Sequence, residues 1–199
     1  MPDPANPNVT DIAIFPLNLV LFPGGLLPLR IFEQRYLEMT KSCLRDDLPF
    51  GVCLIRHGQE VGTPAEHEQI GCSARITQWD MPHTGLFHLS CIGEQAFRLV
   101  ESRPEKNGLI LGRVEWLSSD RDDEIDPGHL DACRSVLEAL VKRAGEDVFA
   151  GPVRLDDPEW VSYRLSELLP VDWRSKQALL EQRSTAQRLA AISGTLPGD

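Results

Sequence analysis

The sequence has little of what nucleic-acid binding requires. Only four of its 199 residues are lysine, its sixteen arginines are scattered, and the formal net charge is −10 at pH 7. Neutralising phosphates needs clustered Lys and Arg side chains. We therefore expect no nucleic-acid partner.

A secretory signal is also missing, because no basic segment is followed by an apolar run and a small-residue cleavage site. The five cysteines are odd in number and widely spaced, and none forms a C-x-x-C pair. This pattern predicts that the cysteines are reduced and mostly buried, and that they act as small apolar residues in a cytoplasmic protein. They are Cys43, Cys53, Cys72, Cys91 and Cys133.

The sequence lacks the motifs of cofactor and metal chemistry. It has neither G-x-x-x-x-G-K-[ST] nor G-x-G-x-x-G nor H-E-x-x-H, so we expect no cofactor and no bound metal. His88 and Cys91 would lie on opposite faces of a strand. Cys53 and His57 would lie about 13 Å apart along a strand, beyond hydrogen-bond reach. The sequence therefore predicts a protein that is not an enzyme.

What the sequence does have is an apolar stretch with no charge between Asp11 and Arg30. Its length alone would suggest a membrane helix. Three prolines, each costing about 3 kcal/mol in a helix interior, exclude that interpretation. They are Pro16, Pro23 and Pro28. The stretch is instead expected to be buried in a soluble fold, with no membrane partner.

This stretch predicts two strands, at residues 11–17 and 26–32, with a turn at Pro23-Gly24-Gly25 between them. A helix is expected to begin near Glu33 and to end near Arg45. Its buried face would carry Phe32, Tyr36, Met39 and Cys43, which recur at helical spacing. On that prediction Phe32→Ala should cost about 3–5 kcal/mol.

Short strands are expected to follow, and then helices. The strands are predicted at residues 50–56, 72–79, 86–92, 95–102 and 109–117, with a loop at 58–68 and turns at 81–85, Gly93-Glu94 and 106–108. Helices should start after Asp126, Asp157, Asp172 and either Ser184 or Thr185. This order predicts an α+β fold. Its predicted parts are a β-rich subdomain at 1–118, an acidic linker at 119–126 and a helical subdomain at 127–199.

Several motifs resemble the N-terminal, substrate-binding domain of the ATP-dependent protease Lon. They are Phe15-Pro16-Leu17, Leu21-Phe22-Pro23-Gly24, the run from Pro28 to Glu33, Arg35-Tyr36, and the run from Ile70 to Ile76. The resemblance spans nearly the whole chain, but no segment matches the ATPase or protease parts of Lon. It implies a PUA-like β pseudobarrel followed by a C-terminal helical bundle.

The resemblance implies a stand-alone, non-catalytic module that binds unfolded or degron-like polypeptide, or a protein partner. Two alternatives stay open. PUA-like domains elsewhere bind RNA, although the acidic balance argues against that function here. The other alternative is an enzyme of unknown type, for which no set of residues argues. A homo-oligomer is also compatible with the sequence.

Candidate binding residues lie in the stretch that carries the resemblance. They are Phe22, Pro23, Arg30, Phe32, Glu33, Arg35 and Tyr36. The charged members could hold a peptide terminus or a partner's charge, or they could form a structural ion pair at the start of the helix. The apolar members could line a hydrophobic groove or belong to the core.

Overall fold

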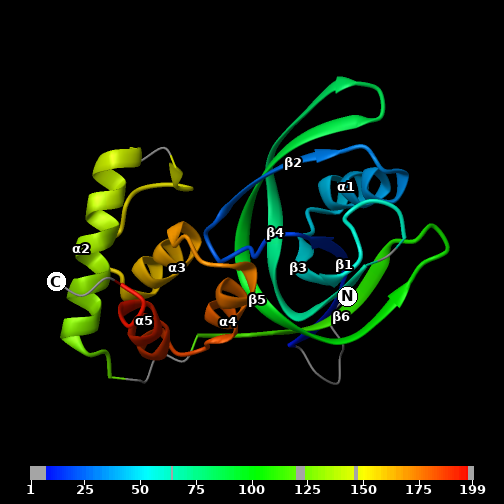
Figure 1. Ribbon diagram of the computed structural model, residues 1–199. Coiled ribbons are helices and arrows are strands. Elements are labelled where there is room, and N and C mark those ends of the chain that lie inside the picture. Colours follow the sequence, from blue (N-terminus) through cyan, green and yellow to red (C-terminus); the bar gives the residue numbers. More distant parts are fainter. Residues whose placement is uncertain (1–7, 64, 120–123, 146–147, 197–199) are drawn as a thin grey trace. The chain divides into compact units, whose positions relative to one another are not determined.

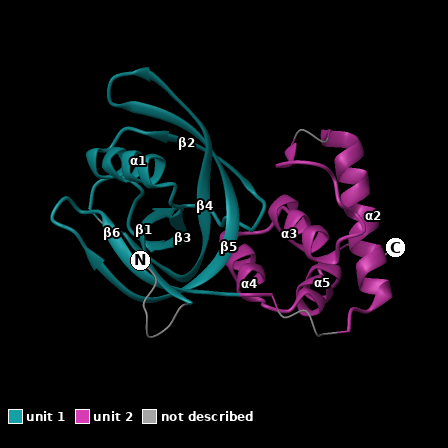
Figure 2. Cartoon of the chain, turned by 180° about the vertical axis from the view of Figure 1, so that it is seen from behind, with its two compact units in different colours: residues 1–117 teal, residues 118–199 magenta. Residues whose placement is uncertain are grey.

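The computed structural model describes residues 8–63, 65–119, 124–145 and 148–196. The chain divides into two compact units, residues 1–117 and 118–199 (Figure 2). Unit 1 combines one mixed sheet with one helix and unit 2 is helical, so the predicted α+β class is confirmed. Residues 120–123, in the middle of the expected acidic linker, lie outside the described residues, and the linker stays a prediction.

Unit 1 is built on a six-stranded sheet in the order β2-β5-β4-β3-β1-β6 (Figure 1). Its strands are β1 (Val9–Leu17), β2 (Leu26–Ile31), β3 (Phe50–His57), β4 (Glu66–His83), β5 (Leu86–Pro104) and β6 (Ile110–Trp116). Among the ladders of the described residues, that of β1 with β3 is parallel and the others are antiparallel. An additional pairing of β5 with β6 closes five of the strands into a ring, to which β2 is added through β5.

The packing inside this closed sheet depends on a glycine. Ile14, Phe97 and Val114 are fully buried there. A Cβ added at Gly51 would lie 2.7 Å from Phe97 Cζ and 2.8 Å from Ile14 Cδ1, well inside the separation at which carbon atoms attract. Glycine at this position therefore makes room for the Phe97 ring.

Helix α1 (Gln34–Asp46) packs its apolar face on the outside of the closed sheet. The Tyr36 ring stacks on Phe15 at 4.0 Å between centroids, and Met39 and Cys43 join the same core cluster, as predicted. The prediction for Phe32 is wrong, because its side chain is 58% exposed. Strand β2 ends at Ile31 and α1 begins at Gln34, so Phe32 lies outside the helix whose face it was expected to share.

The predicted tight turn at Gly93-Glu94 is also wrong, since β5 runs unbroken from Leu86 to Pro104. Gly93 lies beside the turn before β2: Gly24 N–H donates to its carbonyl at 2.6 Å, and its own N–H donates to Gly25 O at 2.9 Å. A Cβ at Gly93 would collide with the Phe22 carbonyl oxygen. The glycine permits close backbone approach rather than a change of direction.

Strand β4 is longer than expected. It begins at Glu66, inside the predicted loop, and continues to His83, so only Thr84 and Gly85 of the predicted 81–85 turn lie between β4 and β5. Register shifts interrupt its pairing with both neighbours. Such bulges let one strand bend and change partner along its length, which breaks the pattern by which a strand is recognised in sequence.

Unit 2 contains four helices within its described residues: α2 (Pro127–Ala144), α3 (Pro158–Leu168), α4 (Trp173–Glu181) and α5 (Thr185–Ser193). Asp126, Asp157, Asp172 and Ser184 each accept a backbone N–H at a helix start, as their sequence positions predicted. Arg188 is fully buried, with its guanidinium 4.0 Å from the Tyr163 ring centroid. Among the described residues, no helix is both long and apolar enough to span a membrane.

Candidate functional site

The predicted charged cluster at the start of α1 is largely structural. Arg35 is 5% exposed, and one of its terminal nitrogens lies 3.0 Å from a Glu33 carboxylate oxygen. The other terminal nitrogen donates to Gly108 O at 3.2 Å, and the guanidinium lies 4.5 Å from the centroid of the Tyr36 ring. Arg35 therefore ties the start of α1 to the turn between β5 and β6.

The seven predicted binding residues separate into buried and accessible members. Phe22 and Tyr36 are buried like Arg35, and burial raises the pKa of the Tyr36 hydroxyl to about 12. Pro23 and Glu33 are half-buried, whereas Arg30 and Phe32 are exposed. A ligand on the surface would therefore reach the half-buried and exposed residues, but not the buried Phe22, Arg35 and Tyr36.

Arg30 and Phe32 have different surroundings. Arg30 lies opposite His88 on β5, which lies opposite Asp80 on β4, so the three form one row across the sheet. Gly62 N–H donates a hydrogen bond to Glu33 Oε2 at 3.4 Å. Phe32 and Val61 directly precede Glu33 and Gly62 in the sequence, and both are more than half exposed. The segments that carry Phe32 and Val61 thus meet at the start of α1.

An apolar groove of about 430 Å³ lies between α1, β1 and β6, and we call it the α1 groove. Its apolar lining residues are Ile12, Ala13, Met39, Cys43, Leu48, Leu109, Leu111 and Trp116. Sequence analysis missed this site because its residues come from separate segments that only the fold brings together. The one signal was Leu48, an apolar residue directly after the acidic end of the helix, which is 54% exposed.

Carboxylates lie at the rim of the α1 groove. Glu38 accepts hydrogen bonds from Gln34 Nε2 at 2.9 Å and from Asn107 Nδ2 at 2.8 Å. These two bonds hold the pKa of Glu38 below its usual value, so it is an anion at neutral pH. Asp11 also lines the groove, with Arg113 at 3.6 Å. The groove combines an apolar floor with a negatively charged rim.

The cysteines do not supply a nucleophile. All five are free and buried, as expected. Burial raises the pKa of Cys43 to about 11 and that of Cys91 to about 12, so both thiols stay protonated near pH 7. Cys53 is 1% exposed, whereas His57 is exposed and lies 3.5 Å from Glu66. No group of three or more potential metal ligands is found in the described ranges.

The fold and this groove define an α+β protein with a preformed apolar surface. The family model for the ATP-dependent protease La (LON) substrate-binding domain matches residues 11–196. The chain belongs to this family. The match covers the substrate-binding domain and extends over both compact units.

Solved structures and curated proteins agree with this assignment. A Lon N-terminal domain protein from Xanthomonas campestris is 34% identical, with a TM-score of 0.78, covering 94% of this chain and 99% of that one. The N-terminal domain of a Mycobacterium avium complex Lon protease shares the fold, with a TM-score of 0.68 at 13% identity. Lon protease of Paraburkholderia phytofirmans is 27% identical over 187 residues, which are 91% of this chain but 23% of that protein. The chain therefore spans about a quarter of the length of that curated relative.

Proposed function

We propose that this chain is a non-catalytic module that binds unfolded or degron-like polypeptide through the α1 groove. One observation carries the proposal: the groove offers about 430 Å³ of preformed space with a mostly apolar lining. Pockets of this size that are lined by apolar side chains are typical of ligand sites. Membership of a substrate-binding domain family supports polypeptide as the ligand.

Binding energy would come from burying apolar side chains of the ligand, without bond-making chemistry. Two apolar side chains at the groove, Met39 and Cys43, belong to the core and give it a rigid floor. Leu48 is exposed and would lose water contact when a ligand covers it. The ionised Glu38 at the rim favours ligands that carry a Lys or Arg beside their apolar residue.

The exposed members of the predicted site form a second part of the proposal. Arg30 and Phe32 would contact a charged and an apolar group of a partner, respectively, whereas Phe22, Arg35 and Tyr36 support the surface from below. We also propose that the closed sheet is a PUA-like pseudobarrel and that unit 2 is a helical bundle. The β5–β6 closure and the packing of α2, α3 and α5 on one another support this.

The test is fluorescence polarisation of fluorescein-labelled casein, an unfolded polypeptide, titrated with the whole chain. Leu48→Asp places a charge at the groove and should weaken binding about tenfold, or about 1.4 kcal/mol. Leu26→Asp is the matched control, because Leu26 is also an exposed leucine of unit 1, at 43%, but does not line the groove.

Equal affinities for the two variants, or no binding of casein by the unmodified chain, would overturn the proposal. A labelled single-stranded RNA provides the comparison with the alternative function. Binding of that RNA that weakens steeply with salt would favour the RNA-binding alternative.

A further inference from the structure

Strands β4 and β5 separate at one end while both remain strands. Their ladder ends at the pair of Ile70 with Arg98. Before that point β4 stays paired with β3, through His67 opposite Ile55. Beyond it β5 stays paired with β6, as far as Pro104 opposite Ile110. Each strand therefore presents one edge to the space between them.

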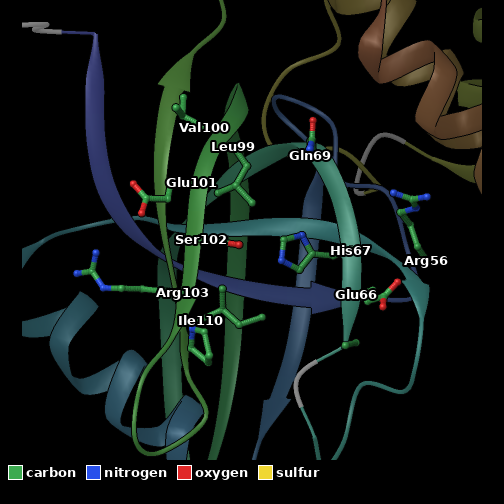
Figure 3. A pocket seen from close by; sticks show the side chains of 12 residues that line it. Arg56, Glu66, His67, Gln69, Leu99, Val100, Glu101, Ser102, Arg103 and Ile110 are labelled. Carbon is green, nitrogen blue, oxygen red and sulfur yellow. The ribbon is translucent and has the colours of Figure 1, made fainter.

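A cleft of about 490 Å³ fills this space. Residues from β4 and from β5 form its two walls, and His67 and Ser102 point toward each other across it (Figure 3). Leu99 and Ile110, which belong to the core cluster inside the closed sheet, form an apolar part of the lining. Arg56 and Glu66 add charged groups of both signs.

The main-chain groups along these two edges lack a strand partner. Among the residues that the structure describes, no backbone hydrogen bond joins positions 66–69 to positions 99–104. In a strand, alternate residues direct their N–H and C=O groups toward the same edge. Groups of both kinds therefore face the cleft, with the alternation interrupted at the register shift between Leu99 and Glu101, and an extended peptide is the ligand that matches them.

We propose that this cleft binds an extended segment of polypeptide by strand addition to the facing edges of β4 and β5. Main-chain hydrogen bonds hold the segment, and one of its apolar side chains contacts Leu99 and Ile110. The site is separate from the α1 groove, but the choice of polypeptide as ligand rests on the proposed function.

The shape of the cleft selects a single chain over a second copy of this protein. Sheets pair edge to edge when their edges are exposed and flat. Here the edges face each other across a hollow, and a bulge between Leu99 and Glu101 interrupts the regular register of β5. A peptide strand can enter such a hollow, whereas the edge of another sheet would be obstructed by the opposite wall.

The probe is a fluorescein-labelled heptapeptide of alternating threonine and valine, which is uncharged and favours extended structure. We expect it to bind the whole chain, and we expect methylation of its central backbone nitrogens to weaken binding at least about tenfold, because the donors are lost. In NMR spectra of the labelled protein, the peptide should shift the amide signals of residues 66–69 and 99–103. Equal binding of the methylated peptide, or unchanged signals at these positions, would overturn the proposal.

Two matched variants locate the site. Ser102→Trp fills the cleft and should weaken peptide binding at least about tenfold. Ser90→Trp changes another exposed serine of β5, at a position where β2 and β4 occupy both edges, and should leave binding unchanged. Retained binding by Ser102→Trp would contradict the proposal.

Casein binding separates this proposal from the proposed function. If the unmodified chain binds casein and Leu48→Asp weakens that binding, but the heptapeptide does not bind, the strand-addition proposal fails and the α1 groove proposal stands. If the heptapeptide binds and Ser102→Trp abolishes this, while Leu48→Asp has no effect on casein, the reverse conclusion holds.

Discussion

Two phenylalanines of the predicted binding site should lose very different amounts of stability when truncated to alanine, and the comparison tests how the site is built. Phe22 is 0% exposed and Phe32 is 58% exposed. Phe22→Ala removes a fully buried ring and leaves a cavity, so it should cost about 3–5 kcal/mol. That is a large share of a typical total stability of about 5–15 kcal/mol.

Phe32→Ala should cost much less. Full burial of a phenylalanine side chain contributes about 1.5–3 kcal/mol, and Phe32 is less than half buried. Water can occupy the space that its ring leaves, so no cavity term is added. We therefore expect a loss of about 1 kcal/mol or less, together with weaker binding of casein if Phe32 contacts the ligand.

The assay must report on unit 1 alone, because the chain has two compact units and a single unfolding curve could combine them. Hydrogen exchange of the β3 amides, followed with increasing urea, gives that local free energy. Similar losses for the two variants would refute the distinction between a buried and a contacting phenylalanine. A loss of about 3 kcal/mol or more for Phe32→Ala would mean that its ring is packed in solution.

Three further changes test other parts of the structure. Gly51→Ala should cost about 1–3 kcal/mol in the β3 exchange assay, because its Cβ would lie 2.7 Å from Phe97 Cζ; a loss below about 0.5 kcal/mol would contradict this packing. Arg35→Ala should cost about 3–5 kcal/mol in the same assay by leaving the partly buried Glu33 unpaired, and a neutral result would show that the pair is not structural. Burial raises the pKa of Glu167 from 4.5 to about 7, so the folded state holds its proton more tightly than the unfolded state. Unit 2 should therefore lose stability as pH rises through that range, and Glu167→Gln, measured by urea unfolding across pH, should remove the loss.

The helix positions were predictable because their signals are local. Asp126, Asp157 and Asp172 each precede a helix and accept backbone N–H groups at its start. A cap and the first turn that it serves lie within a few residues of each other. The strands β1, β2, β3 and β6 were predicted for the same reason, since each is short and bounded by turn residues.

The long strands β4 and β5 could not be read in this way. Gly93 carries the local signal of a turn. In the structure, however, a glycine is needed there because a Cβ would collide with the Phe22 carbonyl oxygen, and Phe22 lies far away in sequence. The α1 groove was missed on the same grounds, because Ala13, Leu48 and Trp116 are brought together only by the pairing of β1 with β6 and the packing of α1. Only a signal confined to one element and its ends can be recognised without the fold.

Arg35 shows why a charged residue beside an apolar stretch has no single interpretation from sequence. Its position at the start of a helix suited either a ligand contact or a structural ion pair. The decisive partner is the Gly108 carbonyl, 73 positions away, at a turn where the glycine has a φ of 83°. A buried guanidinium is costly unless its donors are paired. This distant carbonyl and Glu33 pair the two terminal nitrogens of Arg35, while its buried Nε has no hydrogen-bond partner among the described residues. At the start of α1, a ligand could therefore contact the exposed residues Arg30 and Phe32, but not Arg35.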